Sequence, residues 1–151
     1  MLERKLVFID QSLKSEQAVI NFLSDAAYEN GYLNDREAFV ASVMEREKEF
    51  PTAFGYNVAI PHGKSDSVKR PFVGICRTKD MIGWGKDQKE VKLVFIIGVP
   101  EKEKGTLHLK TLSQISRNLM NEEFRNCLLT SKSIEKMFCV LESVEKEIIL
   151  N

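Results

Sequence analysis

Two histidines and an arginine are the residues whose types and spacing could carry chemistry. His62 lies between Pro61 and Gly63, directly after a short apolar run. Because proline donates no ladder hydrogen bond and glycine frees the backbone, a strand should end here and leave the imidazole at a sheet edge. Such a place suits a reactive nitrogen. The alternative is a turn histidine that a local hydrogen bond holds.

His108 is the second candidate, in the first turn of a predicted helix, where it shares an apolar stripe with Leu112 and Ile115. The positive end of a helix favours an anion and disfavours an imidazolium. A neutral His108 could therefore donate a hydrogen bond to a phosphoryl oxygen. The alternative is a core histidine whose hydrogen bonds are satisfied within the protein.

Arg46 is the third candidate, three residues after Val43 and seven after Phe39 on a predicted helix. This spacing predicts that the guanidinium points inward, where an unpaired charge is costly. The side chain must then find an anion, bond backbone carbonyls, or reach water near the end of the helix. A neighbouring carboxylate would be a permanent partner, and a phosphoryl group would be a transient one.

The elements that must position these residues follow from the apolar spacing. All four prolines lie in the middle third of the chain, where the runs 56–60, 72–77 and 91–97 are predicted to be strands. The run 91–97 is almost continuously apolar, which is typical of a strand that is covered on both faces.

The flanking thirds show helical apolar spacing. Five helices are predicted, and they begin at candidate caps or first turns as follows: Ser15, Asn34, Thr106, Asn121 and Ser133. Gly31 is predicted to stop the first of them. Helices around a central sheet predict an α/β fold of the α+β sandwich kind, with a mixed central β-sheet flanked by helices on both sides.

Composition narrows the function. The chain has 151 residues and is predicted to form one domain over 1–151, with 22 basic and 22 acidic residues and no formal net charge. It therefore lacks the basic field of a dedicated nucleic-acid binder. Because it also lacks a signal peptide and an apolar run of about 18 residues, direct membrane insertion is not expected.

The three cysteines, Cys76, Cys127 and Cys139, contain no C-x-x-C pair. An odd number cannot pair completely within one chain, and two histidines give little support to a structural zinc site. We therefore predict reduced, mostly core-filling thiols, a cytoplasmic location, and neither a metal nor another cofactor.

Taken together, three segments resemble a known family. They are Arg46-Glu47, the run 52–64 that contains Ala-Ile-Pro-His-Gly-Lys, and Leu-His-Leu-Lys-Thr-Leu over 107–112. In this order and spacing they resemble the IIA component of the bacterial phosphoenolpyruvate-dependent sugar phosphotransferase system, of the fructose–mannitol class. The resemblance extends over almost the whole chain.

The resemblance implies a phosphohistidine relay in sugar uptake, and with it a protein-histidine phosphotransferase activity. His62 matches the histidine that takes a phosphoryl group from the carrier HPr and gives it to a IIB component, which serves a membrane IIC transporter. His108 matches the second histidine, which stabilises the phosphorylated state, and Arg46 matches an arginine that flanks the site. The family fold is a mixed sheet flanked by helices.

Two other functions stay open at this point. The same fold occurs in regulatory modules, among them nitrogen-related IIA proteins, in which phosphorylation controls a protein partner. A domain that binds a metal or another ligand through His62 and His108 is the third possibility.

Overall fold

A computed structural model describes residues 1–103 and 105–150, apart from the side chains of residues 108 and 148–150. The strands are β1 (Leu2–Gln11), β2 (Ala53–Gly55), β3 (Val58–Ala59), β4 (His62–Ser65), β5 (Phe72–Trp84) and β6 (Lys89–Pro100). The helices are α1 (Glu16–Glu29), α2 (Arg36–Glu49), α3 (Leu107–Leu119), α4 (Glu122–Thr130) and α5 (Ile134–Leu150).

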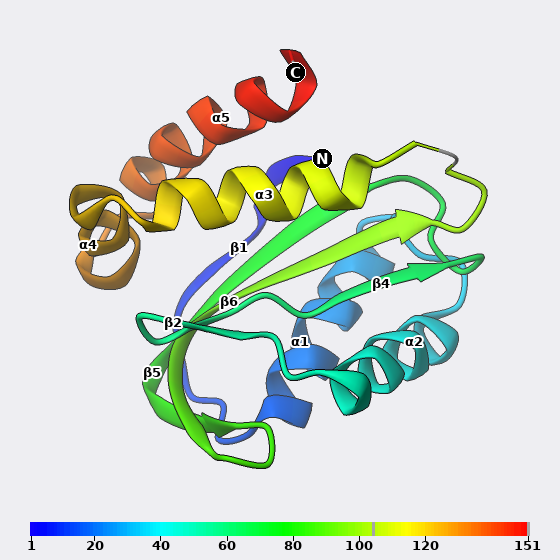
Figure 1. Cartoon of the computed structure of the whole chain (residues 1–151), viewed down its shortest axis with the longest axis horizontal. Coiled ribbons are helices and arrows are strands. Elements are labelled where there is room, and N and C mark those ends of the chain that lie inside the picture. Colours follow the sequence, from blue (N-terminus) through cyan, green and yellow to red (C-terminus); the bar gives the residue numbers. More distant parts are fainter. Residues whose placement is uncertain (104, 151) are drawn as a thin grey trace.

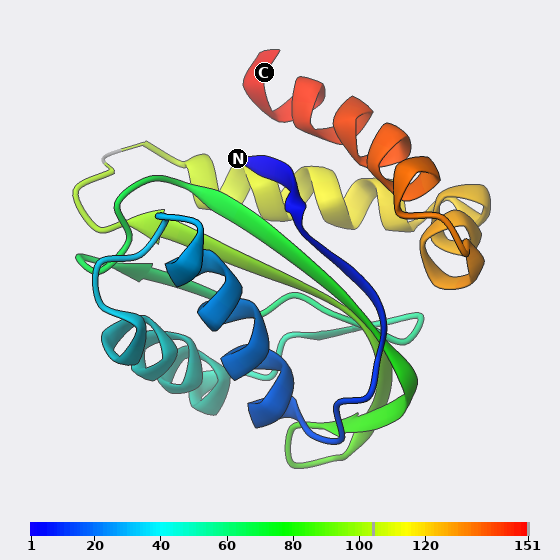
Figure 2. The same cartoon turned by 180° about the vertical axis from the view of Figure 1, so that it is seen from behind.

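One mixed sheet forms the middle layer. Its strand order is β1-β5-β6-β3-β2, and β4 pairs with β6 further along that strand than β3 does. β5 and β6 are antiparallel, whereas β1 runs parallel to β5, and β3 and β4 run parallel to β6. Helices α1 and α2 cover one face, and α3, α4 and α5 cover the other (Figures 1 and 2). The predicted fold class is confirmed.

Each face of the sheet has its own apolar core, and β6 contributes to both. Val94 and Ile96 pack on the α1 and α2 side, whereas Leu93, Phe95 and Ile97 pack on the side of α3, α4 and α5. All five side chains are fully buried. The continuous apolar run that predicted a doubly covered strand is thereby explained, since alternate residues of a strand face opposite sides.

Local signals placed most helix starts correctly. The Ser15 hydroxyl accepts from the Ala18 N–H at 3.1 Å and caps α1. The cap of α2 is Asp35, one residue later than predicted, because its carboxylate accepts from the Ala38 N–H at 3.1 Å. Short polar side chains favour this position because they accept from the otherwise unpaired N–H groups of the first turn.

One strand was not predicted, and another was predicted too long. Residues 2–11, for which no element was predicted from the sequence, form β1, since Leu6 and Val7 are buried on opposite faces of the sheet and the pairing partner is the distant β5. The predicted strand 56–60 is reduced to Val58–Ala59, because Tyr56 and Asn57 have φ values of 55° and 65° and form a turn. Positive φ at two successive residues suits a tight hairpin.

The cysteines differ from one another. Cys76 is buried in the α1 and α2 core, as predicted, and burial raises the pKa of its thiol to about 12. Cys127 is half-buried and Cys139 is exposed, so a core-filling role is wrong for Cys139.

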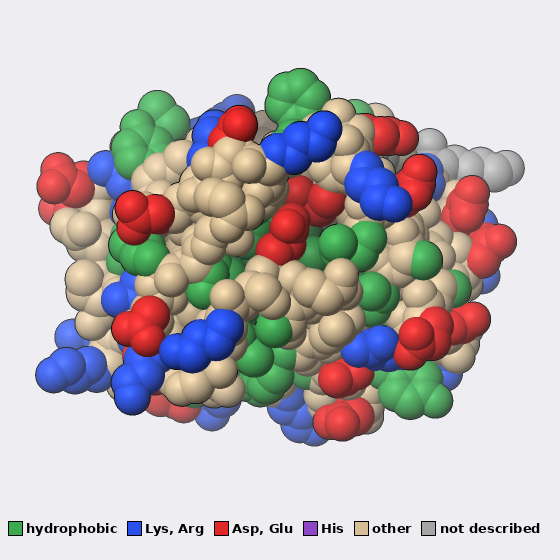
Figure 3. Space-filling model, turned by 90° about the horizontal axis from the view of Figure 1, so that it is seen from below, with side chains coloured by type: hydrophobic (Ala, Val, Ile, Leu, Met, Phe, Trp, Pro, Cys, Tyr) green, Lys and Arg blue, Asp and Glu red, His purple; other side chains and the backbone are tan. Residues whose placement is uncertain are grey.

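The charges on the surface are mixed, as the equal numbers of acidic and basic residues predict. Acidic and basic side chains are interspersed over the face that α1 and α2 present (Figure 3). No helix in the described part of the chain combines the length and apolar character needed to cross a bilayer.

Candidate functional site

His62 is the first residue of β4, a strand that pairs with β6 alone among the described residues. The imidazole thus stands at a sheet edge, as the sequence predicts, but a strand begins at this residue where one was predicted to end. The Pro61 carbonyl accepts from the Ile97 N–H at 3.0 Å, and the parallel pairing of β4 with β6 begins at the next residue. Proline fits this position because its missing N–H is not needed by the ladder.

The register decides which face of the sheet carries the imidazole. His62 pairs with Ile97, whose side chain packs beneath α3. Its neighbour Gly63 faces α2, where an added Cβ would lie 3.0 Å from the Ser42 hydroxyl. Because strand side chains alternate between faces, the His62 ring leaves the sheet on the α3 side. Val58 lies on that side too.

A hydrogen bond to the backbone fixes the tautomer of His62. Its Nδ1 lies 3.0 Å from the Ile60 carbonyl oxygen. A carbonyl oxygen only accepts, so Nδ1 carries the proton. In the neutral ring the lone pair is therefore on Nε2, which is the nitrogen that can act as a nucleophile.

A polar hollow of about 360 Å³ opens between α2 and β4, and His62 is one of the residues that line it. Its lining consists of Ser42, Glu45, Arg46 and Glu49 from α2 and His62, Gly63 and Lys64 from β4. The fold thus brings two of the three sequence candidates, His62 and Arg46, to one place. The lining thus carries two cations and two carboxylates beside His62, and the cations suit a ligand with several anionic oxygens.

Arg46 is half-buried at the rim of this hollow and does not point into the core, so the predicted inward direction was wrong. The buried face of α2 consists of Phe39, Val40, Val43 and Glu47, and Arg46 lies on its flank. The Arg46 Nη1 donates to the Phe50 carbonyl at 2.9 Å. Of the partners that the sequence left open, a backbone carbonyl at the helix end is the one observed.

Glu47, a buried residue next to Arg46, is one that reasoning from apolar spacing missed. Only 6% of it is exposed. Its carboxylate accepts from the Thr52 N–H at 3.1 Å, from the Thr52 hydroxyl, and from the Trp84 indole N–H at 3.2 Å. A glutamate four residues after Val43 on a buried helical face is a signal that would have found it.

His108 is in the first turn of α3, on the face of the sheet that carries the His62 ring. Its side chain lies outside the described residues, so its predicted role stays a prediction. Within the described part of the chain, no three histidine, cysteine or acidic side chains are placed to hold a metal ion.

Comparison with protein families gives a match over almost the whole chain. Residues 1–144 match the family model described as phosphoenolpyruvate-dependent sugar phosphotransferase system, EIIA 2.

Two relatives illustrate the sequence similarity. A fructose-specific EIIA component of this system from Haloferax volcanii is 36% identical over 141 residues, which are 93% of this chain and 91% of that protein. Multiphosphoryl transfer protein 1 of Escherichia coli K12 is 31% identical over 95% of this chain. The chain spans only 17% of the length of this second relative.

Solved structures share the fold. The nitrogen regulatory protein IIA-Ntr of Neisseria meningitidis superposes with a TM-score of 0.83 and 28% identity, over 93% of this chain and 95% of that one. The crystal structure of IIA mannitol from Escherichia coli gives 0.80 at 23% identity, over 93% of this chain and 99% of that one.

Proposed function

The chain belongs to the EIIA 2 family of the phosphoenolpyruvate-dependent sugar phosphotransferase system, and from this premise we propose that His62 accepts a phosphoryl group from phospho-HPr and passes it to a IIB component. The family assignment makes the protein a phosphoryl-transfer component of a sugar phosphotransferase system. The acceptor residue, the donor, the receiving component, a cytoplasmic location and service to a membrane IIC transporter are the proposed parts.

The observation that carries the proposal is the hydrogen bond between His62 Nδ1 and the Ile60 carbonyl. It holds the proton on Nδ1 and so puts the lone pair of the neutral ring on Nε2, the nitrogen that attacks phosphorus. A new N–P bond then forms at Nε2 while the N–P bond of the donor phosphohistidine breaks, and its electron pair returns to the donor nitrogen. In onward transfer a nucleophile of the IIB component forms a new bond to phosphorus, the N–P bond at His62 breaks, and its electron pair returns to Nε2.

The hollow supplies charge for the transferred group. Arg46 and Lys64 lie on its lining, where their charges would oppose the negative charge of the phosphoryl oxygens. We further propose that His108, at the start of α3, stabilises the phosphorylated state through a hydrogen bond to the phosphoryl oxygens.

Intact-protein mass spectrometry after incubation with phosphoenolpyruvate, Enzyme I and HPr tests the acceptor. We expect one acid-labile phosphoryl adduct on the wild type and none on folded His62→Ala. His108→Ala should accept the group but lose it faster or transfer it more slowly. Two-bond ¹H–¹⁵N correlation spectra should place the group on Nε2. An adduct on His62→Ala, or one on Nδ1, would overturn the assignment.

We also propose that residues 1–151 form one folding domain, because β6 supplies side chains to both cores. A single cooperative urea transition, seen equally by circular dichroism and by Trp84 fluorescence, is the expected result. Two separated transitions would contradict it.

A regulatory role is the second candidate, favoured by the similarity to the nitrogen regulatory protein of Neisseria meningitidis. The two roles differ in the second half-reaction. A carrier should lose its phosphoryl group when a IIB component encoded beside it is added, whereas a regulator should keep it. Retention of the group by a competently phosphorylated protein would favour the regulator.

A further inference from the structure

A chain of hydrogen bonds runs from the end of β5 to the proposed phosphoryl acceptor. The Trp84 indole N–H and the Thr52 main-chain N–H both donate to Oε2 of Glu47, at 3.2 and 3.1 Å, and the Thr52 hydroxyl donates to Oε1. The Thr52 carbonyl accepts from the Ile60 N–H at 3.0 Å. The Ile60 carbonyl then accepts from Nδ1 of His62, also at 3.0 Å.

Three links of this relay are almost completely shielded from water, and the fourth, Thr52, is half-buried. Trp84 is 1% exposed, Ile60 3% and Glu47 6%. A carboxylate in such a place must be matched by donors, since an unmatched buried charge is strongly unfavourable. The three donors to Glu47 therefore fix both Thr52 and Trp84 to the end of α2.

Glu47 also sits at a junction in the chain. Its neighbour Arg46 lies at the rim of the hollow. Its hydrogen-bond partner Thr52 lies between α2 and β2, directly before β2. If the carboxylate were removed, Thr52 would lose two of its bonds, and the Thr52 carbonyl that holds Ile60 would no longer be fixed. The Ile60 carbonyl, which sets the tautomer of His62, depends on that contact.

We propose that Glu47 is a positioning residue for His62. Its carboxylate acts through Thr52 and Ile60 to hold the imidazole in the orientation and tautomer that present Nε2 to the incoming phosphoryl group. The inference deepens the proposed function and rests on His62 being the acceptor. Glu47 itself touches neither the acceptor ring nor the hollow.

The first experiment measures the tautomer without any phosphoryl transfer. Two-bond ¹H–¹⁵N spectra of the unphosphorylated protein report both ring nitrogens of each histidine. Only two histidines are present, so His62→Ala assigns the signals. In the neutral ring of the wild type we expect the proton on Nδ1. Glu47→Ala should give a mixture of tautomers, whereas Glu47→Gln should keep the wild-type pattern. The amide oxygen of Gln can accept from the Trp84 and Thr52 N–H groups, and its amide N–H can donate to the Thr52 hydroxyl oxygen.

The second experiment measures the rate of phosphoryl acceptance per folded molecule. Displacement of a reacting group by about 1 Å costs on the order of 10²-fold in rate, and we expect a loss of this order for Glu47→Ala. Glu47→Gln should rescue the rate. Trp84→Phe, which removes the indole donor together with some buried ring volume, should fall between them and provides the test if Glu47→Ala does not fold.

A destabilised control separates positioning from general loss of stability. Leu141→Ala removes buried volume from α5, which packs beside β1 on the face of the sheet opposite to α2. It should lower stability yet leave the His62 tautomer unchanged. A wild-type tautomer and rate in Glu47→Ala would overturn the inference, and so would a mixed tautomer in Leu141→Ala. A protein that shows the expected tautomers but never accepts a phosphoryl group would instead overturn the proposed function.

Discussion

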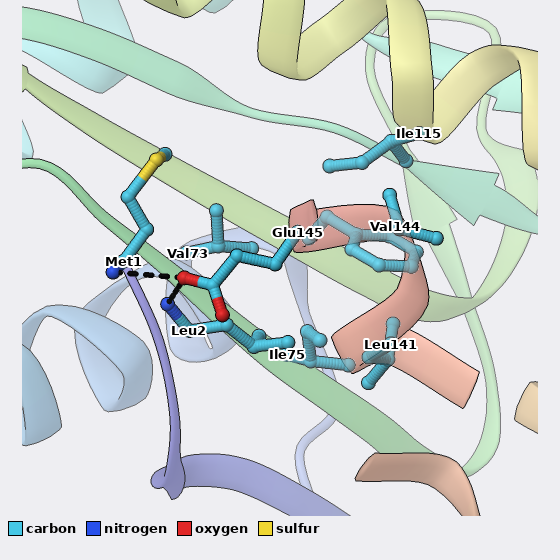
Figure 4. Close-up of a pocket in the computed structure, with 9 residues that line it drawn as sticks. Met1, Leu2, Val73, Ile75, Ile115, Leu141, Val144 and Glu145 are labelled. Carbon is cyan, nitrogen blue, oxygen red and sulfur yellow. Dashed lines mark hydrogen bonds and ion pairs between the residues drawn. The ribbon is translucent and has the colours of Figure 1, made fainter. Parts of the chain in front are cut away.

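The two edges of the sheet where β4 and β1 lie are built from opposite chemistry. At the β4 edge, a hollow of about 360 Å³ is lined by ionisable side chains. At the β1 edge, α5 closes over the strand and leaves about 20 Å³ among apolar side chains. The void there is lined by Met1, Leu2, Val73, Ile75, Phe95, Ile115, Leu141, Val144 and Glu145 (Figure 4).

One polar group closes the β1 edge. Oε1 of Glu145 lies 3.0 Å from the Met1 amino nitrogen and accepts from the Leu2 N–H at 2.8 Å (Figure 4). At the β4 edge, by contrast, Glu47 is buried behind the hollow, where it organises the backbone that holds His62. The comparison shows that one edge uses its carboxylate to seal a core, whereas the other uses one to support an open site.

The largest effect is expected from Leu141→Ala at the β1 edge. Leu141 is 3% exposed, and truncation of such a leucine costs about 2–5 kcal/mol in the free energy of unfolding. Phosphoryl acceptance per folded molecule should not change. Urea unfolding measures the first and mass spectrometry the second. Leu109→Ala, at a position 54% exposed, is the matched control and should be nearly neutral.

Arg46→Ala, at the β4 edge, should lower the rate of phosphoryl acceptance and leave the stability of the fold almost unchanged. Removal of one donor to a developing oxyanion costs about 100-fold in rate, and we expect a similar loss in phosphoryl acceptance. Stability should change little, since the one hydrogen bond described for the guanidinium joins it to the Phe50 carbonyl of its own helix end. Lys48→Ala removes a cation of the same helix turn that lies outside the hollow, and it should keep the wild-type rate.

Glu145→Gln tests the seal of the β1 edge. The amide can still accept from the Leu2 N–H, but the ion pair with the Met1 amino group is lost. We expect a loss of about 1 kcal/mol or less in the free energy of unfolding, because the pair still reaches water. Glu142→Gln, at an exposed position of α5, controls for the change in net charge. An equal loss in both variants would contradict a specific seal.

The smallest effect is a dependence on pH at Glu16, which lies with Glu47 beside a cavity behind the site. Burial, and next the Glu47 charge, raise the pKa of the Glu16 carboxyl. The folded state thus binds this proton more tightly than the unfolded state, so ionisation of the carboxyl destabilises the fold as pH rises. Glu16→Gln should melt slightly higher than the wild type at pH 7, and the difference should disappear near pH 3. A lower melting temperature at pH 7 would contradict this sign.

Much of the molecule followed from local sequence. Ser15 and Asn121 were recognisable caps, because the need for a side-chain acceptor at a helix start is local. The almost continuous apolar run in β6 required cover on both faces, and Pro61 and Gly63 placed His62 at a sheet edge. These features depend on a few neighbouring residues, and so one sequence was enough to predict them.

Only the tertiary structure decided how the site is held together. Residues 2–11 became a strand through pairing with β5, more than sixty residues away, and spacing within the segment cannot express that contact. Likewise, Arg46 and Glu47 are adjacent in the sequence, yet one lines the hollow and the other is buried against Trp84, 37 residues distant. The physical reason is that the cost of burying a carboxylate is met by donors from elements that folding alone brings together.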